Sequence, residues 1–132
     1  MEIEKLKSLL ADFQKAIVSL KEAFALPAID INIDGTIQRF EYTFELGWKL
    51  MRAVADYQGK ESEARNPRNA IRYGAYIELI DNPEAWFTHL NTRNSTVHLY
   101  NKEASRDVYE KIKTFPAAAD QLAKHALELC AK

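Results

Sequence analysis

Residues 37–49 have the sequence IQRFEYTFELGWK and place their large apolar side chains at helical intervals. Phe40, Phe44 and Trp48 are four residues apart, so they lie on one face of a helix. Gly59 follows in the position that a helix C-terminus favours. The segment therefore predicts a long helix whose aromatic stripe packs into a core.

The same periodicity extends in both directions along the chain. Steps of three and four between apolar residues predict a first helix that ends near Pro27. Asn66-Pro67 and Asn82-Pro83 each join an N-cap residue to a first-turn proline, which is typical of a helix start. The predicted helices cover residues 2–25, 37–58, 67–76, 83–97 and 108–129, the last kinked or restarted at Pro116.

The composition agrees with few, long elements. The chain has 132 residues, 18 Lys plus Arg, 19 Asp plus Glu, four glycines and four prolines, too few turn residues for many strands. The fold class that we predict is all-α: an antiparallel, four-helix-bundle-like domain of about five helices that covers residues 1–132. A helical domain of this size often pairs its apolar faces with a second copy, so we expect a homodimer.

Charge and cysteine content exclude several classes of protein. A net charge of −1 gives no overall attraction to nucleic acid, so RNA could bind only at a local patch. The single cysteine, Cys130, excludes a disulfide scaffold and fits a reducing cytoplasm. The charged N-terminus is unlike a secretory signal, and no apolar run has the length of a membrane span.

Residues 29–34 alternate between apolar and polar side chains. A lone strand would have no partner, so we expect a loop here. Asp30, Asn32, Asp34 and Glu41 match a calcium-loop pattern. Pro27 interrupts the entering helix and no second loop exists, so we favour Glu41 as a solvent-facing helical residue and expect no metal site.

The polar segment RNSTVHLY, residues 93–100, is the main candidate site. In a continuous helix Asn94 and His98 share a face, Arg93 flanks it, and His89 one turn earlier is a candidate extension. Arginine binds phosphate through a fixed fork of donors, and histidine can exchange a proton near neutral pH. The structural alternative is that His98 caps the helix or satisfies a buried contact, because an Arg-x4-His pattern is short.

Arg65, Arg68 and Arg72 form a second basic group at a helix start. They can be a small anion-binding patch, which makes Arg68 and Arg72 candidate phosphate or RNA contacts, or a solvated helix face. His125 has no evident partner in the sequence.

Four segments in the same order resemble the HEPN-type nucleotidyltransferase substrate-binding proteins. They are IQRFEYTFELGWK, NPRNAIR, NPEAW and RNSTVHLY, and together they extend over most of the chain. The resemblance implies a dimeric helical bundle, an MNT-type nucleotidyltransferase partner, and a metal-independent endoribonuclease toxin that needs no cofactor. Arg93 and His98 match the family's R-x4-6-H motif, Asn94 matches the polar residue that follows the arginine, and Tyr100 matches the tyrosine that the partner modifies with AMP.

The resemblance leaves one alternative open, and three residues depart from the family pattern. Thr92, Leu99 and Lys102 differ from the residues common in related sequences, and Lys102 bears on the contacts with the partner. The alternative function is a non-catalytic subunit that presents a substrate to a nucleotidyltransferase.

Overall fold

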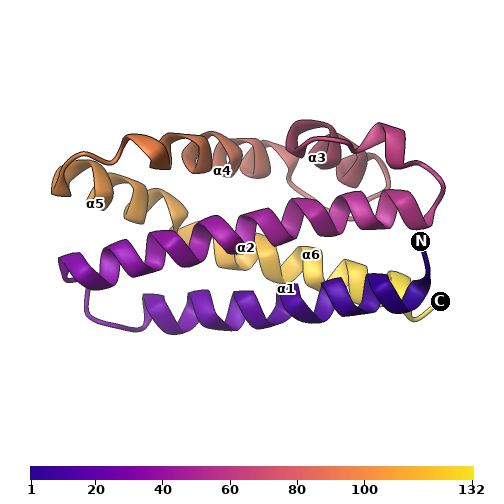
Figure 1. Ribbon diagram of the computed structural model, residues 1–132, viewed down its shortest axis with the longest axis horizontal. Coiled ribbons are helices and arrows are strands. Elements are labelled where there is room, and N and C mark those ends of the chain that lie inside the picture. The colour runs from indigo at the N-terminus through magenta and orange to yellow at the C-terminus, as the bar shows by residue number, and fades with distance from the viewer.

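The computed structural model describes residues 1–132, all of them in an all-helical fold. Six α-helices are joined by short turns (Figure 1). Their bounds are α1 Ile3–Phe24, α2 Asp30–Tyr57, α3 Pro67–Tyr76, α4 Pro83–Ser95, α5 Lys102–Lys111 and α6 Phe115–Cys130. Three 3₁₀ turns interrupt the connections: η1 Glu61–Glu63, η2 Thr96–His98 and η3 Ile112–Thr114.

The long helix α2 is the centre of the bundle. It packs along α1 on one side and against α3, α4 and α5 on the other, while α6 lies beside α1 (Figure 1). Both chain termini lie at one end of the bundle, and the α1–α2 turn lies at the opposite end, near α5. The predicted helical bundle is confirmed, with the last predicted helix divided by η3 into α5 and α6.

The aromatic stripe of α2 builds the core. Phe40 and Phe44 are fully buried and Trp48 is nearly so. The Phe40 and Phe44 rings pack against Phe115 at centroid separations of 5.1 and 5.9 Å, and Phe44 contacts Trp86 at 5.8 Å. Helices α2, α4 and α6 are therefore fixed to one another by a single aromatic cluster.

The caps that the sequence predicts are present. Asn66 Oδ1 accepts a hydrogen bond from the Asn69 backbone N–H at 2.9 Å, and Asn82 Oδ1 accepts one from Ala85 at 3.1 Å. Asn101 caps α5 in the same way, through the Ala104 N–H at 2.8 Å. These side chains satisfy N–H groups that a helix start leaves without partners.

The expectation of a loop at residues 29–34 is wrong, because α2 begins at Asp30. Ile33 and Ile37 are buried and continue the helical spacing to Phe40, whereas Ile31 is 76% exposed. Asp30 in the first turn also favours a helix, since its charge complements the helix dipole. On a helix, Asp30, Asn32 and Asp34 cannot wrap around one ion as a calcium loop requires.

None of the helices combines the length and the apolar composition needed to cross a membrane.

Candidate functional site

The candidate segment lies on the surface where α4 gives way to α5. Helix α4 ends at Ser95, and the 3₁₀ turn η2 leads into residues 99–101. Thr96 donates its hydroxyl to the Arg93 carbonyl at 2.8 Å, which satisfies a carbonyl in the last turn of α4. Val97 is 71% and Tyr100 82% exposed, so the segment is accessible to a large ligand.

Arg93 is held by a carboxylate on α2. Its Nη2 donates a short hydrogen bond to Glu45 Oε2, and both side chains are about one-third exposed. Nη1 donates to Asn94 Oδ1 at 3.4 Å, and Lys49 Nζ lies 3.6 Å from Glu45 Oε1. The guanidinium is thus oriented by Glu45, while its remaining N–H groups are free to bind an anion.

His98 and Tyr100 form the second half of the cluster. His98 Nδ1 lies 3.3 Å from the Tyr100 hydroxyl, and the two ring centroids are 6.1 Å apart. This contact occupies Nδ1 and leaves Nε2 as the nitrogen that can exchange a proton with a ligand. The phenol and the imidazole are therefore accessible to the same ligand.

The two halves are neighbours in the chain but are not bonded to each other. No hydrogen bond joins Arg93 or Asn94 to His98. The prediction that Asn94 and His98 share the face of one continuous α-helix is wrong, because the helix ends at Ser95 and η2 has a tighter repeat. Within one chain the cluster brings together Arg93 with Asn94, and His98 with Tyr100.

His89 does not extend the cluster. It is only 3% exposed and packs between Phe40 and Phe115, at ring-centroid separations of 6.4 and 5.2 Å. Its Nδ1 has no hydrogen-bond partner. Burial lowers the pKa of His89 to about 4, so the imidazole is a neutral core residue at neutral pH.

His125 has partners that the sequence does not reveal. Its Nε2 lies 3.2 Å from Asp81 Oδ2, and its Nδ1 lies 3.7 Å from Glu128 Oε2. The Asp81 contact ties α6 to the α3–α4 connection, whereas the Glu128 contact lies within α6, so His125 is not part of the cluster at residues 93–100.

The second basic group is separate from the main cluster. Arg68 lies over the Phe87 ring at 5.5 Å, and Arg72 Nη1 donates to Asn69 at 3.2 Å. Phe87 precedes Arg93 in α4 by about 9 Å along the helix axis. Both arginines are exposed. Because they lie away from Arg93, a ligand bound at the main cluster could reach them only if it extended along α4.

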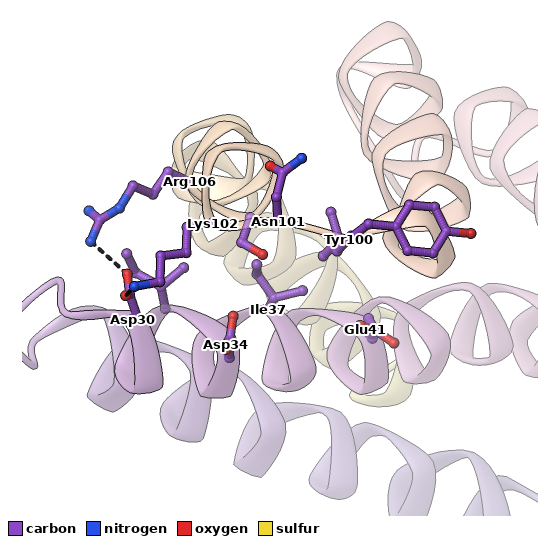
Figure 2. A pocket seen from close by; sticks show the side chains of 11 residues that line it. Asp30, Asp34, Ile37, Glu41, Tyr100, Asn101, Lys102 and Arg106 are labelled. Atoms are coloured by element: carbon purple, nitrogen blue, oxygen red, sulfur yellow. Dashed lines mark hydrogen bonds and ion pairs between the residues drawn. The ribbon is translucent and has the colours of Figure 1, made fainter.

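A third group of charges lies beyond Tyr100, where α5 begins. Lys102 Nζ and Arg106 Nη2 lie 3.1 and 2.8 Å from the two carboxylate oxygens of Asp30 (Figure 2). Hydrogen bonds from Lys102 and then Arg106 lower the pKa of Asp30 below its usual value. The sequence alone does not reveal the ion pairs of Asp30 with Lys102 and Arg106, or that of Glu45 with Arg93. Each pair joins residues that are far apart in the sequence.

These observations define a class: a helical bundle that presents an arginine and an amide in the last turn of one helix, and a histidine and a tyrosine in the exposed connection that follows. The family model described as "Nucleotidyltransferase substrate binding protein like" matches residues 8–128. The chain belongs to this family, as its resemblance to the HEPN-type substrate-binding proteins implies.

Individual relatives agree with this assignment. The Haemophilus influenzae protein named "Probable ribonuclease HepT" is 30% identical over 89 residues, which span 65% of this chain and 61% of that protein. A Thermus thermophilus protein of known structure is 31% identical, with a TM-score of 0.72 over 91% of this chain and 99% of that one.

A second solved structure shares the fold. It is a Haemophilus influenzae protein described as having the fold of a substrate binding domain of a nucleotidyltransferase. It is 23% identical, with a TM-score of 0.70 over 96% of this chain and 99% of that one.

Proposed function

We propose that this protein is the HEPN component of a toxin–antitoxin pair and cleaves RNA without a metal ion. Arg93, Asn94 and His98 are the catalytic residues, and an MNT-type nucleotidyltransferase silences them by transferring AMP to Tyr100. The observation that carries the proposal is that Arg93, held by Glu45 in the last turn of α4, is followed directly by the exposed connection that carries the His98–Tyr100 pair. The family assignment and the ribonuclease name of the Haemophilus influenzae relative support it.

In the first step the substrate supplies its own nucleophile. Neutral His98 accepts the proton of a ribose 2′-OH as the 2′-oxygen attacks the adjacent phosphorus. Arg93 stabilises the charge that develops on the phosphoryl oxygens, and Asn94 orients the phosphate.

A second protomer completes the reaction. Arg93 and His98 are not bonded within one chain, and a homodimer would bring two copies of the cluster to a shared cleft. His98 of the second copy, in its protonated form, gives a proton to the 5′-oxygen as the P–O5′ bond breaks. The products are a 2′,3′-cyclic phosphate and a 5′-OH.

Tyr100 is the proposed point of control. Its hydroxyl oxygen attacks the α-phosphorus of ATP on the partner enzyme, pyrophosphate leaves, and the phenol proton is lost. The new phosphodiester places bulk and a negative charge beside His98, which obstructs the RNA and repels its phosphates.

The direct test is RNA cleavage by purified protein in EDTA. We expect the wild type to cleave and His98→Ala to lose about two orders of magnitude in rate, which is typical of losing a general base. His125→Ala is the matched control, since it removes a histidine that is engaged by Asp81 and Glu128. No cleavage by the wild type, or equal cleavage by wild type and His98→Ala, would contradict the proposal.

The second function is a non-catalytic subunit that presents a substrate to the nucleotidyltransferase, and the description of the family favours it. Arg93 and His98 would then bind a nucleotide phosphate without cleaving RNA. Expression of the chain alone separates the two functions, because only the nuclease is expected to arrest growth.

A further inference from the structure

A cleft of about 430 Å³ lies beside the candidate site, between the first half of α2 and the start of α5. Tyr100 lines the edge of this cleft, and Figure 2 shows its side chain projecting away from the Asp30 end. Its hydroxyl contacts His98 on the other side. One residue therefore separates the proposed cleavage site from the cleft, whose volume is within the range of small-ligand sites.

The cations of the cleft gather at one end, whereas two of its carboxylates have no ion-pair partner. Lys102 and Arg106 are gathered at one end by Asp30. Asp34 and Glu41 also line the cleft and form no ion pair or side-chain hydrogen bond. The cleft thus presents carboxylates that accept hydrogen bonds and repel phosphate, Asp34 one turn from Asp30 and Glu41 toward Tyr100, while the end that holds Lys102 and Arg106 suits phosphate.

The floor of the cleft is apolar. Ile33 and Ile37 from α2, both buried, and Leu99 from the connection line it. An apolar floor with acceptors beside it suits a flat ring that carries N–H donors. A basic side chain from a partner protein would fit less well, because Lys102 and Arg106 lie in the same cleft.

The arrangement continues the charge pattern of the main cluster. On α2, Glu45 pairs with Arg93 at one end of this surface. Asp30 pairs with Lys102 and Arg106 at the other end. Asp30 and Glu45 are about 22 Å apart along α2, with the unpaired carboxylates between them. A single strand crossing this surface would meet cations at both ends and hydrogen-bond acceptors in the middle.

We propose that this cleft is a base-recognition subsite for the RNA that is cleaved at Arg93 and His98. It holds one nucleobase with an exocyclic amino group, which donates an N–H to Glu41 at the Tyr100 end or to Asp34 one turn from Asp30. Lys102 and Arg106 bind a phosphate beyond that base. The inference rests on the proposed nuclease function, and it makes Asp34 and Glu41 specificity-determining residues. AMP on Tyr100 would lie between the two sites and block the strand that joins them.

The test compares RNAs that differ at one base. Short uridine oligonucleotides with a single cytidine, guanosine or inosine are titrated against His98→Ala protein, which leaves the RNA intact, and binding is followed by fluorescence anisotropy. We expect cytidine to bind at least about fivefold tighter than uridine, and guanosine at least about fivefold tighter than inosine. Asp34→Asn with Glu41→Gln removes the preference for an amino group. The amide can turn its oxygen toward an N–H donor or its N–H₂ group toward a carbonyl, so it accommodates both kinds of base.

The matched control is Asp12→Asn with Glu22→Gln, which makes the same charge change at exposed positions of α1. The control keeps the base preference, so the ratio of affinities reports recognition rather than net charge. Equal affinity for the paired oligonucleotides, or a preference that survives Asp34→Asn with Glu41→Gln, would overturn the subsite. A third result would also overturn the subsite: the wild type shows no base preference, and the double variant binds an arginine-rich peptide more weakly than the wild type does. The cleft would then serve a protein partner.

A cleavage assay on the wild type separates the two proposals. Cleavage without base preference leaves the nuclease function standing and removes the subsite. A base preference that depends on Asp34 and Glu41, in a protein that never cleaves RNA, supports the cleft and overturns the nuclease function. No binding of any oligonucleotide and no cleavage would overturn both.

Discussion

His89 and His98 lie nine residues apart and have opposite roles because their surroundings differ. The His98 ring is exposed beside Tyr100, whereas His89 is enclosed by Phe40 and Phe115. Sequence spacing treats both as candidates, since it records the residue type and not the burial. Burial therefore excludes His89 from proton transfer at neutral pH.

The depressed pKa of His89 predicts that the protein loses stability in mild acid. The pKa is about 4 in the folded state and about 6.5 in an unfolded chain, so the unfolded chain takes up the proton first. The contribution of neutral His89 to the free energy of unfolding is fully present above about pH 6.5. It is lost as the pH decreases toward 4, which lowers the free energy of unfolding by up to about 3 kcal/mol. Denaturant unfolding at several pH values checks this. His89→Leu should flatten the dependence in that window, and an equal slope in both proteins would contradict the assignment.

Glu45 is the residue of the cluster that the sequence does not identify. Its spacing suggests only a solvent-facing pair with Lys49, which is present at 3.6 Å. The contact with Arg93 joins α2 to α4 across 48 positions of the chain, so only the folded structure reveals it. Glu45 thus orients Arg93 and also competes with any phosphate that binds there.

Removing the charge of Glu45 should strengthen anion binding at Arg93. We expect Glu45→Gln, combined with His98→Ala to prevent cleavage, to bind a short RNA roughly threefold to tenfold tighter, after allowance for solvent screening. Glu103→Gln, an exposed carboxylate on α5, is the control. An affinity unchanged by Glu45→Gln at low salt would show that Glu45 does not compete with RNA.

At the scale of elements, local signals can be predicted from the sequence and long-range ones cannot. The starts of α3 and α4 are correct because Asn66 and Asn82 cap their own helices. The start of α2 is missed because the alternation around Ile31 and Ile33 imitates a strand. Residues 93–100 form one continuous segment, so the sequence identifies them as a candidate site. The cleft could not be predicted in this way, because its residues come from α2 and α5, which meet only in the folded structure.

Two glycines within α2 predict opposite effects of the same substitution. A Cβ on Gly47 would lie 3.2 Å from the Phe13 ring and 3.3 Å from Trp86, both fully buried, so α1 and α4 approach closely there. Nothing lies within 4 Å of a Cβ on Gly35. We expect Gly47→Ala to lower the free energy of unfolding by about 1 kcal/mol through overpacking, and Gly35→Ala to raise it by roughly 0.5–1 kcal/mol. Thermal or denaturant unfolding checks both, and stabilisation by Gly47→Ala would show that the aromatic rings can move apart.

At the level of the whole molecule, the net charge is −1, and the cations of the candidate site are already paired with carboxylates. Arg93, Lys102 and Arg106 each contact a carboxylate of α2. An RNA that binds at the proposed site would therefore compete with these carboxylates, and the net charge of −1 gives it no overall electrostatic attraction. That any nucleic-acid contact is local stays a prediction.

The proposed mechanism requires two copies of the chain, which predicts a dependence of activity on concentration. We expect sedimentation to give about twice the monomer mass of 15.1 kDa at working concentrations. On dilution below the dimer dissociation constant, the RNA cleavage rate per chain should fall with the dimer fraction. A constant rate per chain in a sample shown to be monomeric would contradict a shared site.

The proposed chemistry is cleavage of RNA at the Arg93 and His98 cluster through attack by the substrate's own 2′-OH. The most direct measurement uses a DNA oligonucleotide that contains one ribonucleotide, in EDTA, with the products identified by mass spectrometry. We expect a single cut after the ribonucleotide, which leaves a 2′,3′-cyclic phosphate and a 5′-OH, at a rate about 100-fold lower in His98→Ala. Cleavage at deoxyribose positions, products with a 5′-phosphate, or equal rates in the two proteins would contradict it.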